Sequence, residues 1–273
     1  MHQPMIETRK QEEIDFHDRV RQGVYEQRWS PEGEARVAHD PLWSNFKYYA
    51  IEGASLALSR QWLREYGRHA TVLDYCCGNG EDAIYLARHG AARVIGIDIS
   101  DVSIQNCRRG ASAAGVDDRV TFETMDAEAL TFEDNTFDLV NEYGVLHHLD
   151  LDTSMAELVR VLKPGGRFIG TETLGHNPLI RWYRTRTPEL RTAWEAQHIL
   201  RRDSFELMRR YFSTVEMHFF HLATLAAVPF RMTPVFRPLL AGLRGIDAAL
   251  LRLPGLRWHA WQTVFMLSGP RKK

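Results

Sequence analysis

The chain has little cysteine: 273 residues include only Cys76, Cys77 and Cys107. Adjacent cysteines do not readily bridge each other, and three thiols cannot form a disulfide framework. They also lack the histidine and cysteine partners that a zinc site needs, so no metal-ligand set is predicted. The scarcity of cysteine excludes a disulfide-stabilised secreted domain and favours a reducing, cytoplasmic compartment.

Long hydrophobic runs are missing as well. The longest apolar segment, residues 222–230, is about half the roughly 18 residues of a membrane-spanning helix. Residues 1–13 lack the apolar stretch of a signal peptide. The composition is 44% hydrophobic, 25% charged and 11% aromatic, which excludes a disordered or collagen-like chain. We therefore expect a soluble globular protein with one large α/β domain, or a domain with an added segment.

Net charge is almost absent, but the two parts of the chain differ in sign. The formal total is -1, whereas residues 1–175 carry 18 basic and 29 acidic residues and residues 176–273 carry 16 and 6. Such an asymmetry favours an anionic partner for the C-terminal part. No RNA-recognition signature accompanies these basic residues, so nucleic acid is not expected.

Hydrophobic periodicity changes at about residue 68. Phe16, Val20 and Val24 recur at helical spacing, as do apolar residues between 42 and 66, which predicts an N-terminal helical cap over residues 1–68. From residue 71 onward, short apolar runs alternate with helical segments, a pattern typical of a parallel sheet with helices on both faces. The predicted strands are 71–75, 93–98, 120–124, 137–141, 167–171, 215–221 and 261–267. The predicted helices after residue 71 are 80–89, 102–114, 153–162 and 204–211.

A glycine-rich turn follows the first predicted strand. Residues 72–83 read Val-Leu-Asp-Tyr-Cys-Cys-Gly-Asn-Gly-Glu-Asp-Ala, which indicates a strand, a turn with two glycines and the start of a helix. At this place in a parallel sheet the backbone approaches a ligand closely and the helix N-terminus faces it. The spacing from Gly78 to Ala83 also matches the dinucleotide fingerprint G-x-G-x-x-A, but that match alone is weak.

Aspartates at the strand ends narrow the choice of ligand. Asp74 ends the first strand, where a carboxylate suits a cationic group better than a pyrophosphate. Asp98 ends the second strand, where a carboxylate can accept both hydroxyls of a ribose, and Asp126 follows the third, where it can meet an adenine amino group. A ligand with an adenosine end and a positively charged end satisfies all three, and S-adenosyl-L-methionine is such a ligand.

Over residues 70–172 the chain resembles the class I S-adenosylmethionine-dependent methyltransferases. The matching segments are 72–80, 95–100 (Ile-Gly-Ile-Asp-Ile-Ser), 126–127 (Asp-Ala), 137–140 (Phe-Asp-Leu-Val), 145–149 (Val-Leu-His-His-Leu) and 162–167 (Leu-Lys-Pro-Gly-Gly-Arg). The resemblance implies a Rossmann-like sheet of seven mostly parallel strands with helices on both faces and a helical insertion before the last strand. It implies a methyltransferase domain over residues 69–273, with substrate or lid segments at 176–212 and 222–258.

The resemblance also implies which residues bind S-adenosyl-L-methionine. The glycine turn holds the methionine part, Asp98 the ribose and Asp126 the adenine, against which Ile99 packs. The expected donor-binding residues are Asp74, Cys76, Gly78, Gly80, Asp98, Ile99, Asp126, Ala127 and Asn141. Cys76 stands where the family usually has glycine. A cysteine there narrows the pocket, and the resemblance does not say how this turn contacts the methionine carboxylate.

Residues after the fourth and fifth predicted strands bear on the methyl acceptor. Residues 141–144 read Asn-Glu-Tyr-Gly rather than Asn/Asp-Pro-Pro-Tyr/Phe, which argues against methylation of adenine or glutamine amino groups. Glu172 follows the fifth strand at the sheet edge where active sites lie, so we expect it to act as a general base; a helix cap or an ion pair is the alternative. We expect His147 and His148 to pack or to line the substrate pocket rather than to catalyse.

A segment rich in arginine and aromatic residues comes next. Arg181 and Arg184 share a helical face, and arginine suits bidentate phosphate binding; a solvated basic face is the alternative. The expected substrate-binding residues are Tyr49, His176, Asn177, Arg181, Trp182 and Arg184. With Glu172 as proton acceptor, this set favours C-methylation of the alkene of a geranyl- or farnesyl-type prenyl diphosphate. The resemblance to prenyl diphosphate C-methyltransferases then implies Mg²⁺ on the diphosphate, and aromatic faces would stabilise the cation.

Two other enzyme classes stay open. An O- or N-methyltransferase of a small natural product would use Trp43, Tyr48 and Tyr49 and the 222–258 insertion as a lid. A nicotinamide-dependent oxidoreductase fits the glycine spacing, but Asp74 and Asp126 argue against it.

A binding protein for a membrane surface is the third alternative. Residues 222–273 contain eight basic residues and one acid among many leucines, a composition typical of an interfacial amphipathic element. A lid helix with a buried apolar face is the favoured interpretation of the same segment. Peripheral membrane contact thus stays open, and the sequence does not predict the oligomeric state.

Overall fold

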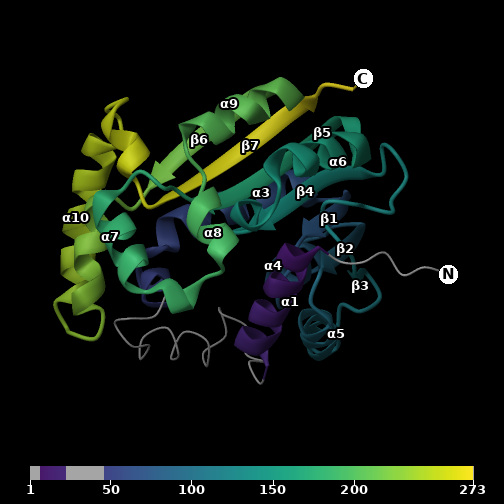
Figure 1. The fold of residues 1–273 in the computed structure, drawn as a ribbon, viewed down its shortest axis with the longest axis horizontal. Helices are drawn as coiled ribbons and strands as arrows, with labels where there is room; N and C mark the ends of the chain where they lie inside the picture. Colours follow the sequence, from purple (N-terminus) through teal and green to yellow (C-terminus); the bar gives the residue numbers. More distant parts are fainter. Residues whose placement is uncertain (1–6, 23–45, 273) are drawn as a thin grey trace.

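A computed structural model describes residues 7–22 and 46–272 of the protein (Figure 1). Its strands are β1 (Thr71–Tyr75), β2 (Arg93–Asp98), β3 (Val120–Thr124), β4 (Phe137–Tyr143), β5 (Leu162–Thr173), β6 (Phe212–Phe220) and β7 (Gln262–Pro270). Its α-helices are α1 (Thr8–Arg21), α3 (Gly53–Gly67), α4 (Glu81–Arg88), α5 (Asp101–Ala114), α6 (Leu151–Val161), α7 (Pro178–Arg186), α8 (Ala193–His198), α9 (Arg202–Tyr211) and α10 (Phe236–Leu250). Short 3-10 helices are η1 (Phe46–Ile51), η2 (Leu146–His148), η3 (Pro188–Leu190), η4 (Ala223–Phe230) and η5 (Leu256–His259).

The strands form one sheet in the order β3-β2-β1-β4-β5-β7-β6. Neighbours from β3 to β5 pair in parallel, and β7 runs antiparallel between β5 and β6. The predicted fold class, a seven-stranded and mostly parallel sheet, is confirmed. Because β1 pairs with both β2 and β4, the strand order reverses beside β1, and open α/β sheets bind ligands outside the carboxyl ends of the strands at such a reversal.

Helices cover both faces of this sheet, as predicted. Successive side chains of a strand point to opposite faces. Leu73 and Ile95 therefore pack with α6 and α9 on one face, while Val72 and Val94 pack with α3, α4 and α5 on the other. The N-terminal segment contributes α3 to this second layer, since α3 contacts β4, β5 and β7. The boundary predicted at residue 68 therefore lies between a helix and a strand of the same packed unit.

Most predicted elements appear, with differences at their ends. The first three strands have the predicted bounds, whereas β4 extends to Tyr143 and β5 already begins at Leu162, so the Pro-Gly-Gly sequence at 164–166 lies within its span. The predicted helix at 153–162 begins earlier because Asp150 caps it, its side chain accepting from the backbone N–H of Thr153. The stretch predicted as helical from 42 to 66 consists of η1 and α3 in its described part. Val24 and residues 42–45, with Trp43, lie outside the described residues.

The insertion before β7 packs against the domain. Buried apolar residues of η4 and α10 form a cluster with one residue each from η1 and α7 and with the residue before β7. The members of this cluster are Ile51, Ile180, Ala227, Val228, Leu240 and Trp261. The insertion thus has the buried apolar face expected of a lid. In the described part of the chain, no helix has both the length and the apolar character to cross a membrane.

Candidate active site

A cavity of about 750 Å³ opens beside the carboxyl ends of the parallel strands. Its walls include Asp74 at the end of β1, Asp98 at the end of β2 and Tyr143 at the end of β4. Side chains of α1, η1 and α7 close it from other sides. The cavity therefore lies at the strand reversal, where the sequence places the donor site.

The glycine turn between β1 and α4 has the backbone that such a site needs. Gly78 and Gly80 have φ angles of 57° and 75°, in the left-handed region where a side chain is strained. Cys76 has a φ of 53° without being glycine, so the departure from the family pattern is accommodated at a cost of about 1 kcal/mol. A Cβ on Gly80 would lie 3.1 Å from Cys107 Sγ and from the ring of Phe122. The turn thus depends on glycine for both conformation and space.

Asp74 lies under this turn, buried to 3% exposure. Its Oδ2 accepts a hydrogen bond from the backbone N–H of Ala83 in α4 at 3.0 Å, and its Oδ1 accepts one from Nδ2 of Asn141 at 3.0 Å. Burial and the nearby charge of Asp82 raise the pKa of Asp74 above its ordinary value. Asp74 thus binds a backbone N–H of the first turn of α4, and it lines the cavity too. Oδ1 of Asn141 is buried without a hydrogen-bond partner among the described residues.

The two other aspartates, Asp98 and Asp126, form ion pairs with basic side chains of α1. Oδ2 of Asp98 accepts from the backbone N–H of Gly78 at 3.0 Å and faces Nη1 of Arg21 at 3.3 Å. Nζ of Lys10 lies 2.7 Å from Oδ2 of Asp126. Ile99 and Ala127 line the cavity beside these carboxylates, whereas Gly80 and Asn141 stand behind its wall. Helix α1 therefore lies across the predicted ribose and adenine positions.

Glu172 does not line the cavity, although its neighbours Thr171 and Thr173 do. It is fully buried at the end of β5; Oε1 accepts from the backbone N–H of Leu146 at 2.6 Å, and Oε2 lies 2.7 Å from Nδ1 of His147. His147 is the member of this pair that reaches the cavity wall. Burial opposes protonation of His147, but the charge and hydrogen bond of Glu172 outweigh it and raise the pKa of His147.

The predicted substrate residues divide into two groups. Tyr49 and Arg184 line the cavity, and Nη2 of Arg184 donates to Oγ1 of Thr173 at 3.0 Å. Burial lowers the pKa of Arg184 to about 10. Arg191 also lines the cavity, so two guanidinium groups stand on this wall.

The remaining four predicted substrate residues lie elsewhere. Asn177 caps α7, its side chain accepting from two backbone N–H groups of that helix. His176 lies in a separate surface hollow, while Arg181 and Trp182 are exposed on the outer face of α7. Only the opposite face of α7 turns toward the cavity, because Ile180 and the residues one turn later pack inward.

An aromatic wall of the cavity was not predicted as a unit. The ring centroid of Tyr48 lies 5.7 Å from that of Tyr183 and 5.2 Å from that of Trp261. These rings come from η1, α7 and the residue before β7, so no local motif joins them. The only sequence signal was the concentration of aromatic residues in each of these segments.

Comparison with known proteins identifies the central region. Residues 72–166 match the model of a methyltransferase domain family. The chain is 36% identical over 150 residues to a demethylmenaquinone methyltransferase of Lactiplantibacillus plantarum, covering 50% of this chain and 63% of that protein. It is 43% identical over 97 residues to a 27-O-demethylrifamycin SV methyltransferase of Amycolatopsis mediterranei, covering 35% of this chain and 36% of that protein. The chain thus spans less than two thirds of these relatives.

Solved structures extend the likeness to the whole fold. A geranyl diphosphate C-methyltransferase of Streptomyces coelicolor has a TM-score of 0.61 at 16% identity, with 99% of this chain and 100% of that chain covered. At such identity the likeness concerns the fold. Together, the family match over residues 72–166, the relatives and the sheet confirm the predicted resemblance to the S-adenosylmethionine-dependent methyltransferases.

Proposed function

We propose that the protein transfers a methyl group from S-adenosyl-L-methionine to a hydroxyl group of a small molecule bound in the cavity. The observation that carries this proposal is the hydrogen-bonded pair of His147 and Glu172, with His147 at the cavity wall. S-adenosyl-L-methionine, when bound, supplies a methyl group on a positively charged sulfur. Asp98 and Asp126 would hold its ribose and adenine, because both carboxylates line the cavity. In this structure they form ion pairs with Arg21 and Lys10 of α1.

His147 is the proton acceptor in this proposal. Since Nδ1 of His147 is hydrogen-bonded to the carboxylate of Glu172, the ring nitrogen that can accept a proton is Nε2. As the acceptor oxygen takes the methyl group, its hydroxyl proton passes to Nε2. The role of Glu172 becomes that of a positioning residue, which fixes the ring and its tautomer, because its own oxygens are buried and bonded.

A phenolic or enolic hydroxyl fits this site best. The aromatic wall of Tyr48, Tyr183 and Trp261 suits a flat or apolar body, and a phenolic hydroxyl is acidic enough for an imidazole base. The name of one relative, a 27-O-demethylrifamycin SV methyltransferase, indicates transfer of a methyl group to an oxygen. A basic nitrogen acceptor would have less need of the His147–Glu172 pair.

C-methylation of a prenyl diphosphate is the second candidate, favoured by two cationic side chains on the cavity wall. Arg184 and Arg191 could meet the diphosphate, and the aromatic wall could meet the prenyl chain. Against it, Glu189 and Glu195 share that wall, and NH groups of both arginines already bond to protein oxygens. Mg²⁺ prefers oxygen ligands, whereas both groups of potential ligand atoms found among the described residues contain two histidines. Any Mg²⁺ would then be held mainly by the diphosphate itself.

The test is incubation with methyl-labelled S-adenosyl-L-methionine and a panel of acceptors. The panel contains naphthoquinols, other phenols, and geranyl and farnesyl diphosphates. We expect label in a hydroxyl-bearing acceptor, and a His147→Asn variant should lose roughly 100-fold or more in kcat. A matched control is His218→Asn, which removes an exposed histidine of β6 and should keep full activity. Full activity in His147→Asn would show that His147 is not the proton acceptor. Label in prenyl diphosphates alone would favour C-methylation, the second candidate.

We also propose that the end of the molecule formed by α7 and α10 contacts an anionic membrane surface (Figure 1). Among the described residues, eight of the nine exposed large apolar side chains lie between 179 and 256. These eight are Leu179, Trp182, Phe230, Met232, Val235, Ile246, Leu253 and Leu256. Asp247, the one acid of residues 222–273, is buried against Thr224, so the exposed charges of that segment are basic. Apolar side chains among arginines fit the interface of anionic lipids.

Co-sedimentation with vesicles tests this contact. We expect binding to phosphatidylglycerol-containing vesicles that weakens with salt, and little binding to neutral ones. Trp182→Glu should weaken it at least about fivefold, whereas Val20→Glu, which alters the ninth exposed apolar residue, should not. Absence of vesicle binding, or a dimer in solution that Trp182→Glu dissociates, would contradict the proposal.

A further inference from the structure

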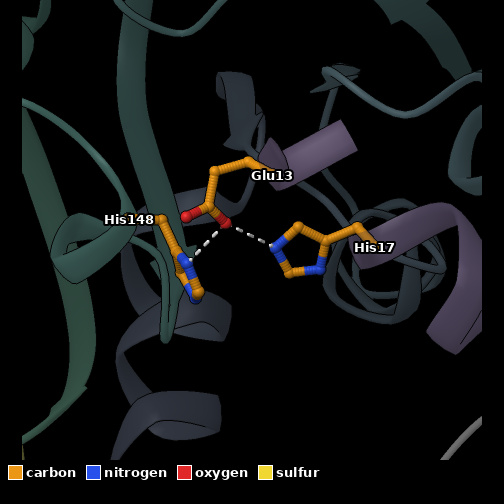
Figure 2. A group of neighbouring side chains, drawn as sticks. All are labelled: Glu13, His17 and His148. Carbon is orange, nitrogen blue, oxygen red and sulfur yellow. Dashed lines mark hydrogen bonds and ion pairs between the residues drawn. The ribbon is translucent and has the colours of Figure 1, made fainter. Parts of the chain in front are cut away.

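A cluster of three ionisable side chains joins α1 to η2 beside His147. Oε2 of Glu13 lies 3.0 Å from Nδ1 of His148 and 3.4 Å from Nε2 of His17 (Figure 2). One potential ligand atom from each residue lies within 4.8 Å of the other two. All three side chains line the cavity, and Glu13 is 6% exposed. A buried carboxylate thus stands between two imidazole nitrogens at the edge of the site.

We propose that Glu13, His17 and His148 bind one divalent transition-metal ion of the Zn²⁺ type. Zinc lies about 2.0–2.2 Å from nitrogen and oxygen ligands, so atoms around a tetrahedral ion stand roughly 3.4 Å apart. The separations from Glu13 Oε2 to the two imidazole nitrogens are of this size. Two imidazoles and one carboxylate suit zinc or its transition-metal neighbours and do not suit Mg²⁺.

The surroundings of Glu13 resemble those of a metal ligand. Its second oxygen, Oε1, accepts a hydrogen bond from Oγ1 of Thr192, which fixes the carboxylate from outside the cluster. Metal ligands are commonly oriented by such outer contacts. His148 is itself held in η2, whose backbone is fixed at Leu146 by Glu172. The ion would therefore tie α1 to the part of the chain that carries His147.

Three protein ligands leave a coordination position open, as catalytic zinc sites do. Because the three ligands line the cavity, an anionic oxygen of the acceptor could take this position. That oxygen could belong to a carboxylate, a phosphate or an ionised hydroxyl. The assignment of the open position to the acceptor rests on the proposed function, whereas binding of the ion does not.

A second group of potential ligand atoms includes His148 together with His147 and Glu195. We assign the ion to the first group for two reasons. Nδ1 of His147 is already bonded to Glu172, and Glu13 already contacts both imidazoles of the first group through one oxygen. The two assignments differ in whether His17 or His147 is required, which makes them separable by substitution.

Titration of chelator-treated protein with Co²⁺, followed by visible absorption, tests the site. We expect one Co²⁺ per chain, with the intense bands of a low-coordinate nitrogen and oxygen site, and displacement by Zn²⁺. Glu13→Gln, His17→Gln and His148→Gln should each weaken binding at least tenfold. The matched control is His218→Gln, because His218 also lies 3.0 Å from a carboxylate, that of Glu216, but in an exposed pair on β6.

Two further measurements separate the two groups of ligand atoms and test ion binding on the wild-type protein. His147→Asn should still bind Co²⁺; binding that is lost there and kept in His17→Gln would assign the ion to the second group and overturn the proposal. For wild-type protein, Zn²⁺ should slow amide hydrogen exchange in α1 but not in α9, so no variant needs to fold for this test. Absence of stoichiometric binding, or unchanged exchange in α1, would also overturn it. Binding of S-adenosylhomocysteine, measured in parallel, reports separately on the proposed function.

Discussion

At the scale of residues, the proposed base His147 depends on one buried carboxylate, that of Glu172. Glu172 and Glu142 lie close together in the interior, and burial with the charge of Glu172 raises the pKa of Glu142 well above its usual range. The carboxylate of Glu172 faces His147, with Oε2 lying 2.7 Å from Nδ1 of the ring. Glu172→Gln keeps the shape but removes this charge. We expect kcat to fall roughly 10- to 100-fold with little change in KM, because the ring of His147 loses its orienting partner.

Steady-state kinetics with the acceptor found in the panel measures this split between kcat and KM. Thermal unfolding of the same variant separates positioning from folding. A variant with unchanged kcat, or one in which KM alone rises, would show that Glu172 serves only the packing of β5.

At the scale of elements, helix α1 competes for the donor site. Arg21 shares Oδ2 of Asp98 with the backbone N–H of Gly78, so a ribose hydroxyl must displace the guanidinium. The guanidinium of Arg21 is partly exposed and can return to water when displaced, so we take its ion pair as contributing about 1 kcal/mol. Arg21→Met should therefore tighten binding of S-adenosylhomocysteine by up to about fivefold, as measured by calorimetry.

The comparison variant is Arg88→Met, which removes an arginine from α4 that has no contact with the donor aspartates among the described residues. It should leave the affinity unchanged. Weaker binding in Arg21→Met would mean instead that Arg21 helps to hold the donor.

At the scale of the whole molecule, His221 connects the insertion to the sheet. Its Nε2 lies 3.0 Å from Ser55 Oγ in α3 and its Nδ1 3.3 Å from Thr224 Oγ1 in η4, close to Asp247 and Arg244 of α10. Burial and the charge of Arg244 lower its pKa to about 3, against about 6.5 in the unfolded chain. The unfolded chain therefore takes up this proton first as the pH falls, and stability is lost below about pH 6.5.

By pH 5 this single group should cost about 2 kcal/mol of the free energy of unfolding. Urea unfolding at pH 7.5 and pH 5.0 measures the loss, and His221→Gln should show a loss smaller by that amount. Comparing the two proteins cancels the other groups that titrate in this interval. An equal pH dependence in both would contradict the buried neutral state of His221.

Local sequence patterns were sufficient to predict the strands and aspartates around the expected donor site. The ends of β1, β2 and β3 followed from short apolar runs; Asp74 and Asp98 lie within the last two residues of β1 and β2, and Asp126 follows β3 by two residues. Asp74, Asp98 and Asp126 therefore reached the cavity as expected. The acceptor half depends on contacts between distant segments, for which no local spacing exists.

His147 and Glu172 illustrate the difference. They meet because β4 and β5 pair in parallel, and sequence spacing alone did not indicate that Glu172 would turn inward. Likewise, the face of α7 that turns inward depends on Ile180 packing in one cluster with η4 and α10, so Arg184 lies inside and Arg181 outside. The position of α1 over the cavity depends on Lys10 and Arg21 meeting acids more than 70 residues away.

Calorimetric titration with S-adenosylhomocysteine tests directly whether the cavity binds the methyl donor. We expect one binding site per chain, no binding of NAD, and a loss of at least tenfold in affinity when Asp98 is replaced by alanine. Replacement of Glu216, an exposed acid of β6, should leave the affinity unchanged. Failure of the wild-type protein to bind S-adenosylhomocysteine, or an affinity that does not depend on Asp98, would contradict a donor site in this cavity.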